Sequence, residues 1–231
     1  MRFIAALAAV SALLAGCEYA GPPDNAVARN LTWFSYLGGE NIEKSCAPGA
    51  PDRYRFVYNG IYQKQIRSYD VSLLPGGRGA SVSAFARGEG DLTQGLTVSQ
   101  IGAIWGGTRA QAAMSPQGLA DLRAALAADG MPGSRPSVLR LPSNEFYWTA
   151  AACIEGQFHT NAWLWPSERF MTLKFPAVLL AHDRTGIELY ESRPFNKRDD
   201  DPTMDSGDKS PYDTFVVQLG PEGFVSTKGL F

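Results

Sequence analysis

One stretch in the second half of the chain gathers the side chains best suited to binding a ligand. Residues Gln157 to Trp165 alternate in the manner of a β-strand, which places His159, Asn161, Trp163 and Trp165 on one face. Indole faces beside an imidazole and an amide can stack on a sugar and orient it. The alternation therefore predicts a ligand-binding strand. Tryptophans at this spacing also form the packed face of a sheet, which is the competing interpretation.

Carboxylates near this strand raise the question of catalysis. Glu145 and Glu155 are the acidic residues that precede it. Glycoside hydrolysis requires an acid and a base or nucleophile, supplied by two carboxyl groups at a set separation. The sequence supplies the residue types and leaves their separation open.

Other patterns that support catalysis or metal binding are missing from the sequence. The two histidines, His159 and His182, belong to no HExxH motif, and CxxC, G-x-S-x-G and phosphate-loop motifs are absent. The aspartates between residues 199 and 208 miss the spacing of a calcium loop, and Pro202 interrupts them. We therefore expect no metal and no cofactor, and the sequence leans away from an enzyme.

The first seventeen residues, MRFIAALAAVSALLAGC, have a composition of their own. Arg2 precedes an apolar stretch of about 13 residues, which is too short to span a bilayer and suits a signal-peptide core. Leu14-Ala15-Gly16-Cys17 resembles the lipobox of bacterial lipoproteins; the alternative is an ordinary secretory signal with a chance cysteine. The resemblance implies that Cys17 receives a diacylglyceryl group and, after removal of residues 1–16, becomes the new N-terminus.

The same resemblance implies a location. Lipid on Cys17 would attach the protein to a membrane of the cell envelope. Glu18 occupies the position at which lipoproteins retained in the inner membrane commonly carry aspartate, so we expect the outer membrane, facing the periplasm. Residues 17–30 are small and polar with two prolines, which predicts a flexible tether before a domain that starts near Leu31.

Cys46 and Cys153 remain once Cys17 carries lipid. The oxidising envelope favours a disulfide between them, and two separate buried thiols are the alternative. A third interpretation pairs the Cys153 thiol with His159, and we favour the disulfide over it.

The first half of the chain predicts strands and then a helix. Arg53–Tyr58, an Asn59-Gly60 turn, Ile61–Leu74 and Ala80–Arg87 together predict a three-stranded antiparallel meander. The central helix is predicted over 116–129, with Ser115 as N-cap, a leucine stripe and a stop at Gly130. Short helices are expected at 40–46 and 97–105.

The second half predicts more strands. They cover 146–153, 157–165, 169–175, 177–182 and 187–191, and a closing hairpin joins 215–219 to 224–227. Residues 196–211 are acidic and without apolar period, which predicts a mobile loop. The expected fold class is α+β: a single domain, residues 31–231, with predominantly antiparallel sheet, one central helix and one or two short helices.

Composition narrows the classes of function that this chain can have. The 231 residues carry a net charge of −2 and are 45% hydrophobic, which is typical of a globular domain. No basic patch indicates nucleic-acid binding. We expect a lipid-anchored lipoprotein with a non-catalytic binding or scaffolding role and an envelope protein or glycan as partner. The alternative is a carbohydrate-binding protein or glycan hydrolase that uses the strand around Trp163.

Overall fold

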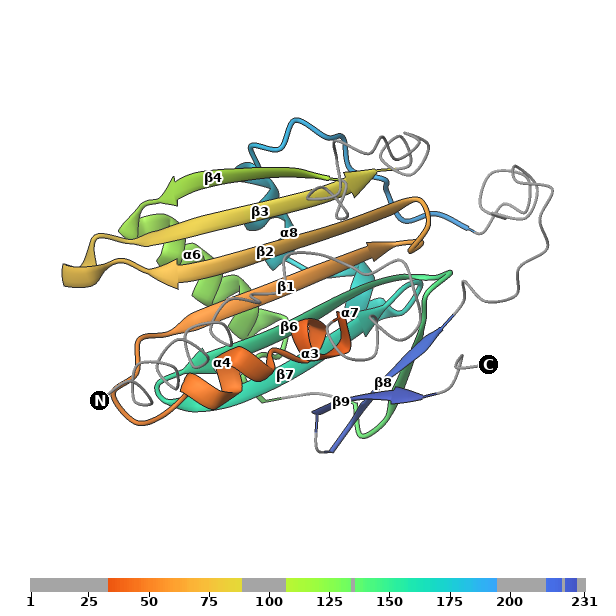
Figure 1. The fold of residues 1–231 in the computed structure, drawn as a ribbon, viewed down its shortest axis with the longest axis horizontal. Helices are drawn as coiled ribbons and strands as arrows, with labels where there is room; N and C mark the ends of the chain where they lie inside the picture. Colours follow the sequence, from red (N-terminus) through yellow and green to blue (C-terminus); the bar gives the residue numbers. More distant parts are fainter. Residues whose placement is uncertain (1–32, 89–106, 134–135, 195–214, 222, 228–231) are drawn as a thin grey trace, which may run out of the picture.

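Two antiparallel sheets form the framework of the domain (Figure 1). The computed structural model describes residues 33–88, 107–133, 136–194, 215–221 and 223–227. The larger sheet has the order β4-β3-β2-β1-β6-β7 and consists of β1 (Arg53–Gly60), β2 (Gln65–Leu73), β3 (Ala80–Gly88), β4 (Thr108–Met114), β6 (Phe146–Ile154) and β7 (Gln157–Leu164). The smaller sheet has the order β5-β8-β9 and consists of β5 (Leu139–Pro142), β8 (Val216–Gly220) and β9 (Gly223–Thr227). The α+β fold class, mostly antiparallel, is confirmed.

One face of the larger sheet packs against α6 (Pro116–Ala128) and α8 (Phe175–Ala181), which lie behind it in Figure 1. Strand alternation directs Tyr54, Phe56 and Tyr58 of β1 into this layer. The Phe56 ring stacks on Phe175 of α8, with ring centroids 5.1 Å apart. This aromatic layer is the main core.

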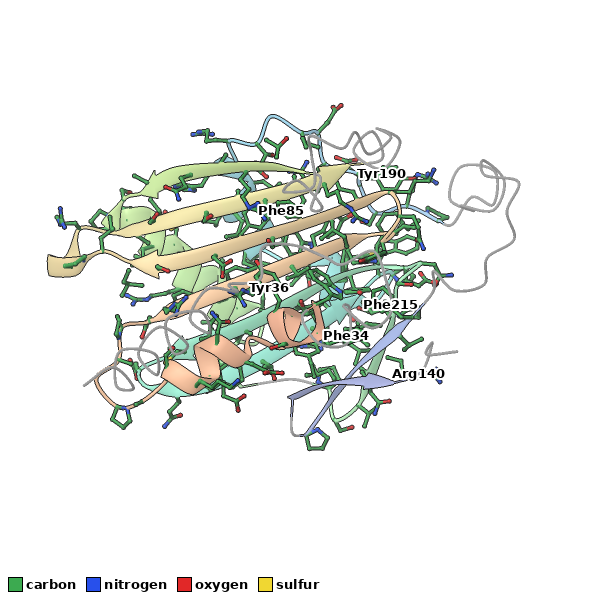
Figure 2. The ribbon with its side chains drawn as sticks, in the orientation of Figure 1. Phe34, Tyr36, Phe85, Arg140, Tyr190 and Phe215 are labelled. Carbon is green, nitrogen blue, oxygen red and sulfur yellow. A yellow bond between two sulfur atoms is a disulfide. The ribbon has the colours of Figure 1, made fainter. Side chains whose placement is uncertain are left out.

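The opposite face packs against α3 (Phe34–Gly38), α4 (Glu40–Ser45) and the smaller sheet. Phe34 and Phe215, both labelled in Figure 2, meet edge to face with centroids 5.5 Å apart. Gly39 joins the two helices at φ 72°, and a Cβ there would lie 2.5 Å from the Cβ of Ala151. Only glycine allows this corner to lie directly on β6.

A disulfide fixes α4 over the sheet. The Sγ atoms of Cys46, at the C-cap of α4, and of Cys153, in β6, are 1.99 Å apart. The predicted pair is therefore present in the structure, which leaves Cys153 without a free thiol for a partnership with His159.

The central helix forms as predicted because its signals are local. The Ser115 side chain accepts the N–H of Gly118 at 3.1 Å, Pro116 occupies the first turn, and the leucines at 119, 122 and 126 are buried. Gly130 follows the helix at φ 85°. The helix ends at Ala128, one residue before the predicted end.

The predicted turn at Asn59-Gly60 is wrong. Both residues belong to β1, and the chain reverses over residues 61–64, with Ile61 at φ 59°. The Asn59 amide donates to the carbonyl of Ser143 at 2.9 Å, so it connects β1 to a distant loop. The side chain of Ile61 is buried in the core. Tertiary contacts therefore outweigh the local turn preference.

The strands predicted over 169–175, 177–182 and 187–191 are also wrong. The structure has α7 (Glu168–Met171) and α8 there, and residues 182–194, the described stretch that follows α8, form neither helix nor strand. Asp129, at the end of α6, accepts the backbone N–H of Lys174 and of Phe175, both at 2.9 Å. This carboxylate caps α8 from 45 residues away, so the short apolar run becomes a helix.

Buried polar groups hold the segment after α8, residues 183–190, on β2. Arg67 is 1% exposed, and its Nη1 lies 2.6 Å from the carboxylate of Asp183. The hydroxyl of Tyr69 donates to the same carboxylate at 2.6 Å, and Arg67 Nη2 donates to the carbonyl of Ile187. The ion pair is therefore enclosed and surrounded by hydrogen bonds.

The far end of this segment is fixed in the same way. Gln65 donates to the carbonyl of Glu188 at 2.8 Å and accepts the N–H of Tyr190 at 2.9 Å. Tyr58 donates its hydroxyl to the carbonyl of Tyr190 at 2.7 Å. The segment has no helix or strand, yet side chains of β1 and β2 form hydrogen bonds with several of its backbone groups.

Several sequence predictions concern parts of the chain outside the described residues. They are the leader at 1–16, the tether at 17–30, the helix at 97–105 and the acidic loop at 196–211. The closing hairpin is described as β8 and β9, close to its predicted bounds.

One buried hydroxyl leads to a stability prediction. Thr149 Oγ1 is buried without a hydrogen-bond partner among the described residues, and Val57 lies opposite it on β1. We expect Thr149→Val to leave stability unchanged or to raise it by about 1 kcal/mol, because an unsatisfied polar group is removed. The matched change Val57→Thr buries a new hydroxyl and is expected to cost about 1–3 kcal/mol. Urea unfolding measures both, and a loss above about 1 kcal/mol in Thr149→Val contradicts the prediction.

Candidate functional site

An open cavity of about 540 Å³ lies where the β6–β7 hairpin meets the loop that follows α6. It contains a carboxylate, two side-chain amides, an imidazole, a hydroxyl and an aromatic ring. The lining residues are Met131, Pro132, Gly133, Ile154, Glu155, Gln157, Phe158, His159, Thr160 and Asn161.

The structure separates the four residues predicted to bind a ligand. His159 and Asn161 line the cavity, and the two tryptophans do not. Trp163 is 1% exposed; its Nε1 donates to the carbonyl of Asp129 at 3.1 Å, and its ring lies 5.0 Å from that of Phe175. Trp163 therefore offers no face to a sugar, and its spacing reflects core packing. Trp165 is half-buried against the same core.

Asn161 shapes the cavity wall. Its Nδ2 donates to the carbonyl of Gly130 at 3.0 Å, and its Oδ1 accepts the N–H of Ala162 at 2.8 Å. Arg169 Nη2 lies 3.2 Å from the same Oδ1. These bonds join the loop after α6 to β7 and occupy both polar atoms of the amide, so we assign Asn161 a positioning role.

The turn between β6 and β7 presents the carboxylate. Glu155 and Gly156 both have positive φ, 52° and 75°, as a two-residue hairpin turn requires. A Cβ at Gly156 would lie 2.6 Å from the carbonyl oxygen of Ala47. Asp52 Oδ1 accepts the N–H of Glu155 at 2.9 Å. Asp52 therefore holds the backbone of the turn, while the side chain of Glu155 is exposed.

Asp52 connects this turn to α6. Its Oδ2 accepts the hydroxyl of Tyr54 at 2.9 Å and Nη2 of Arg123 at 2.7 Å. Burial acts to raise the pKa of Asp52. Hydrogen bonds from the Glu155 N–H, Tyr54 and Arg123 outweigh this and hold the pKa below its ordinary value.

This shift predicts a pH dependence. A carboxyl whose pKa falls on folding stabilises the protein above its ordinary pKa of about 3.9, and the stabilisation is lost as pH falls through the folded value. We expect Asp52→Asn to be about 1–2 kcal/mol less stable than the unchanged chain at pH 7, with the gap closing below about pH 4. Urea midpoints from pH 2 to 7 test this, with Asp121→Asn on the exposed side of α6 as control. A gap that persists unchanged at pH 2 contradicts it.

The carboxylates do not form a hydrolytic pair. Glu145 precedes β6 and Glu155 follows it, so the nine-residue strand separates them by about 30 Å. Glycoside hydrolysis needs its two carboxyl groups within about 10 Å. Glu155 is the carboxylate that lines the cavity, and Glu145 lies at the other end of β6. The arrangement offers hydrogen-bond donors and acceptors for a polar ligand.

No group of three His, Cys, Asp or Glu side chains within the described ranges could hold a metal ion. In the same ranges, no helix has the length and apolar character needed to cross a membrane.

Comparison with protein families, curated proteins and solved structures finds no match for this chain.

Sequence reasoning missed part of the cavity. It placed a helix stop at Gly130 without assigning a role to Met131–Gly133, and it did not single out Gln157. The Glu155-Gly156 pair between two alternating runs was a hairpin signal that could have placed this carboxylate beside His159.

Proposed function

We propose that this protein is a lipid-anchored lipoprotein of the cell envelope with a non-catalytic binding or scaffolding role facing the periplasm. The lipobox-like leader supports attachment through Cys17. The disulfide between Cys46 and Cys153 supports an oxidising compartment, because such bonds are rare in the cytosol. Glu18 favours the outer membrane.

The observation that carries the binding role is the grouping of Glu155, Gln157 and His159 around one cavity. A carboxylate, an amide and an imidazole on one rigid hairpin can orient a ligand that presents hydroxyl, amide or charged groups. The partner that fits is an envelope protein or a glycan with such groups. We do not carry forward stacking on Trp163, because that indole is buried.

The attachment is tested by metabolic labelling with palmitate. The unchanged chain is expected to incorporate the label and to fractionate with the outer membrane. Cys17→Ser is expected to lose the label, and labelling that persists in this variant contradicts the proposal.

The binding role is tested with a photo-crosslinking amino acid in cells. Gln157 lies at the cavity, and Gln117 is an exposed glutamine on α6, so the two positions form a matched pair. We expect an adduct from position 157, none from 117, and loss of the adduct when His159→Ala is added. Mass spectrometry then distinguishes a protein from a glycan. Equal adducts at both positions, or none at 157, contradict the proposal.

A further inference from the structure

Strand β4 forms one edge of the larger sheet. Within the part of the chain that the structure describes, its only strand neighbour is β3. An edge strand presents a row of backbone N–H and C=O groups that another strand can pair with.

The hydrogen-bond alternation of the sheet identifies these residues. The N–H of Leu74 donates to the carbonyl of Gly79 at 2.9 Å, which fixes which pairs between β2 and β3 are hydrogen-bonded. Every second residue of β3 then bonds to β2, and the others bond to β4. In the register of β3 and β4, the residues of β4 that bond to β3 alternate with Arg109, Gln111 and Ala113. The backbone N–H and C=O groups of these three residues therefore point away from the sheet. All three residues are exposed.

The other edge of the sheet, formed by β7, is covered at Ala162. On β7 the outward N–H of Ala162 donates to Asn161 Oδ1 at 2.8 Å, and Arg169 Nη1 lies 3.4 Å from the carbonyl of Ala162. Strand β4 has neither proline nor bulge, since its register with β3 runs without interruption over seven pairs. Its one charge, the Arg109 guanidinium, lies 4.9 Å from the ring centroid of Phe85, which is labelled in Figure 2.

We propose that β4 pairs with β4 of a second copy of this chain, antiparallel and centred on Gln111. The three outward residues are evenly spaced about Gln111, so a twofold axis there places Gln111 opposite its own copy and Arg109 opposite Ala113. The two arginines do not face each other. Ala110 and Ala112 form the intervening pairs, and their methyl groups allow the backbones to approach. The two larger sheets become one continuous sheet.

Cysteine crosslinking of the full chain in the bacterial envelope tests this register. The Cα atoms of a hydrogen-bonded antiparallel pair lie about 5.5 Å apart, within disulfide range. Gln111→Cys is therefore expected to give a covalent dimer. In the same register, two copies of residue 109 lie about 14 Å apart. Arg109→Cys and Ala113→Cys are each expected to give at least tenfold less dimer, and the double variant is expected to restore it.

The pattern of crosslinks decides the proposal. No dimer from Gln111→Cys, or as much from Arg109→Cys alone, overturns it. Crosslinking of Gln111→Cys to a different envelope protein also overturns it, in favour of another strand donor.

Light scattering on the purified full chain provides a second measurement. Proline lacks the N–H that the pairing needs, so Gln111→Pro is expected to weaken dimerisation at least tenfold. Gln111→Ser, which keeps the N–H, is expected to dimerise as before. Equal dimerisation of the two folded variants overturns the proposal.

Discussion

Replacing Arg67 with methionine is expected to lower the free energy of unfolding by about 3–5 kcal/mol, because it leaves a buried charge without its partner. In the folded variant the Asp183 carboxylate would be enclosed without the guanidinium that now lies 2.6 Å away. The carbonyl of Ile187 would lose its donor as well. The segment over 183–190 should then detach from β2 before the rest of the domain unfolds, and hydrogen exchange should locate the effect there.

The control for this prediction is an ion pair on the solvent-exposed surface of the protein. Lys44 and Glu40 are i,i+4 neighbours on α4 with exposed side chains, and Lys44→Met is expected to cost less than about 1 kcal/mol. Adding Asp183→Leu to Arg67→Met should cost less than the sum of the two single changes, because both remove the same pair. A loss in Arg67→Met as small as in the Lys44 control contradicts the assignment of a buried network.

Reduction of the Cys46–Cys153 disulfide is expected to cost about 4–5 kcal/mol. The two cysteines are 107 residues apart, and the chain-entropy model gives this value for a loop of that size. The denaturant m-value should rise together with the loss, because the reduced unfolded chain is more expanded and exposes more surface.

The reduced chain and the Cys46→Ala/Cys153→Ala variant serve as controls for each other. Both should show the same lower midpoint and the same steeper m-value in urea. A loss below about 1 kcal/mol with an unchanged m-value contradicts the prediction. A loss in the double variant alone would instead assign the effect to the packing of Cys153, which is buried.

The sequence predicted those elements whose signals lie within the element. Helix α6 carries its own cap in Ser115 and its own leucine stripe. Strands β1, β2, β3, β6 and β7 carry runs of β-forming or alternating residues, whereas β4 was not predicted. Helix α8 was mistaken for a strand because its cap, Asp129, comes from another helix. The turn at residues 61–64 was misplaced because Asn59 serves a distant loop.

The sequence likewise predicted only part of the candidate site. Alternation correctly placed His159, Asn161 and Trp163 on one face of β7, but it cannot tell whether helices cover that face. Here α6 and α8 cover the part that holds Trp163, and the cavity begins where that cover ends, at His159. The ion pair of Arg67 and Asp183 had no local signal, because its members are 116 residues apart.

The disulfide has a consequence for proteolysis of the domain. Cys46 lies before β1 and Cys153 lies in β6, so the span between them includes β1 to β4, α6 and β5. A single peptide bond cleaved anywhere in that span leaves two fragments that remain covalently joined and able to keep their sheet contacts. The nicked protein would migrate as one species without reductant and as two with it. The covalent connection between the two ends of this span therefore does not depend on an unbroken backbone between the two cysteines.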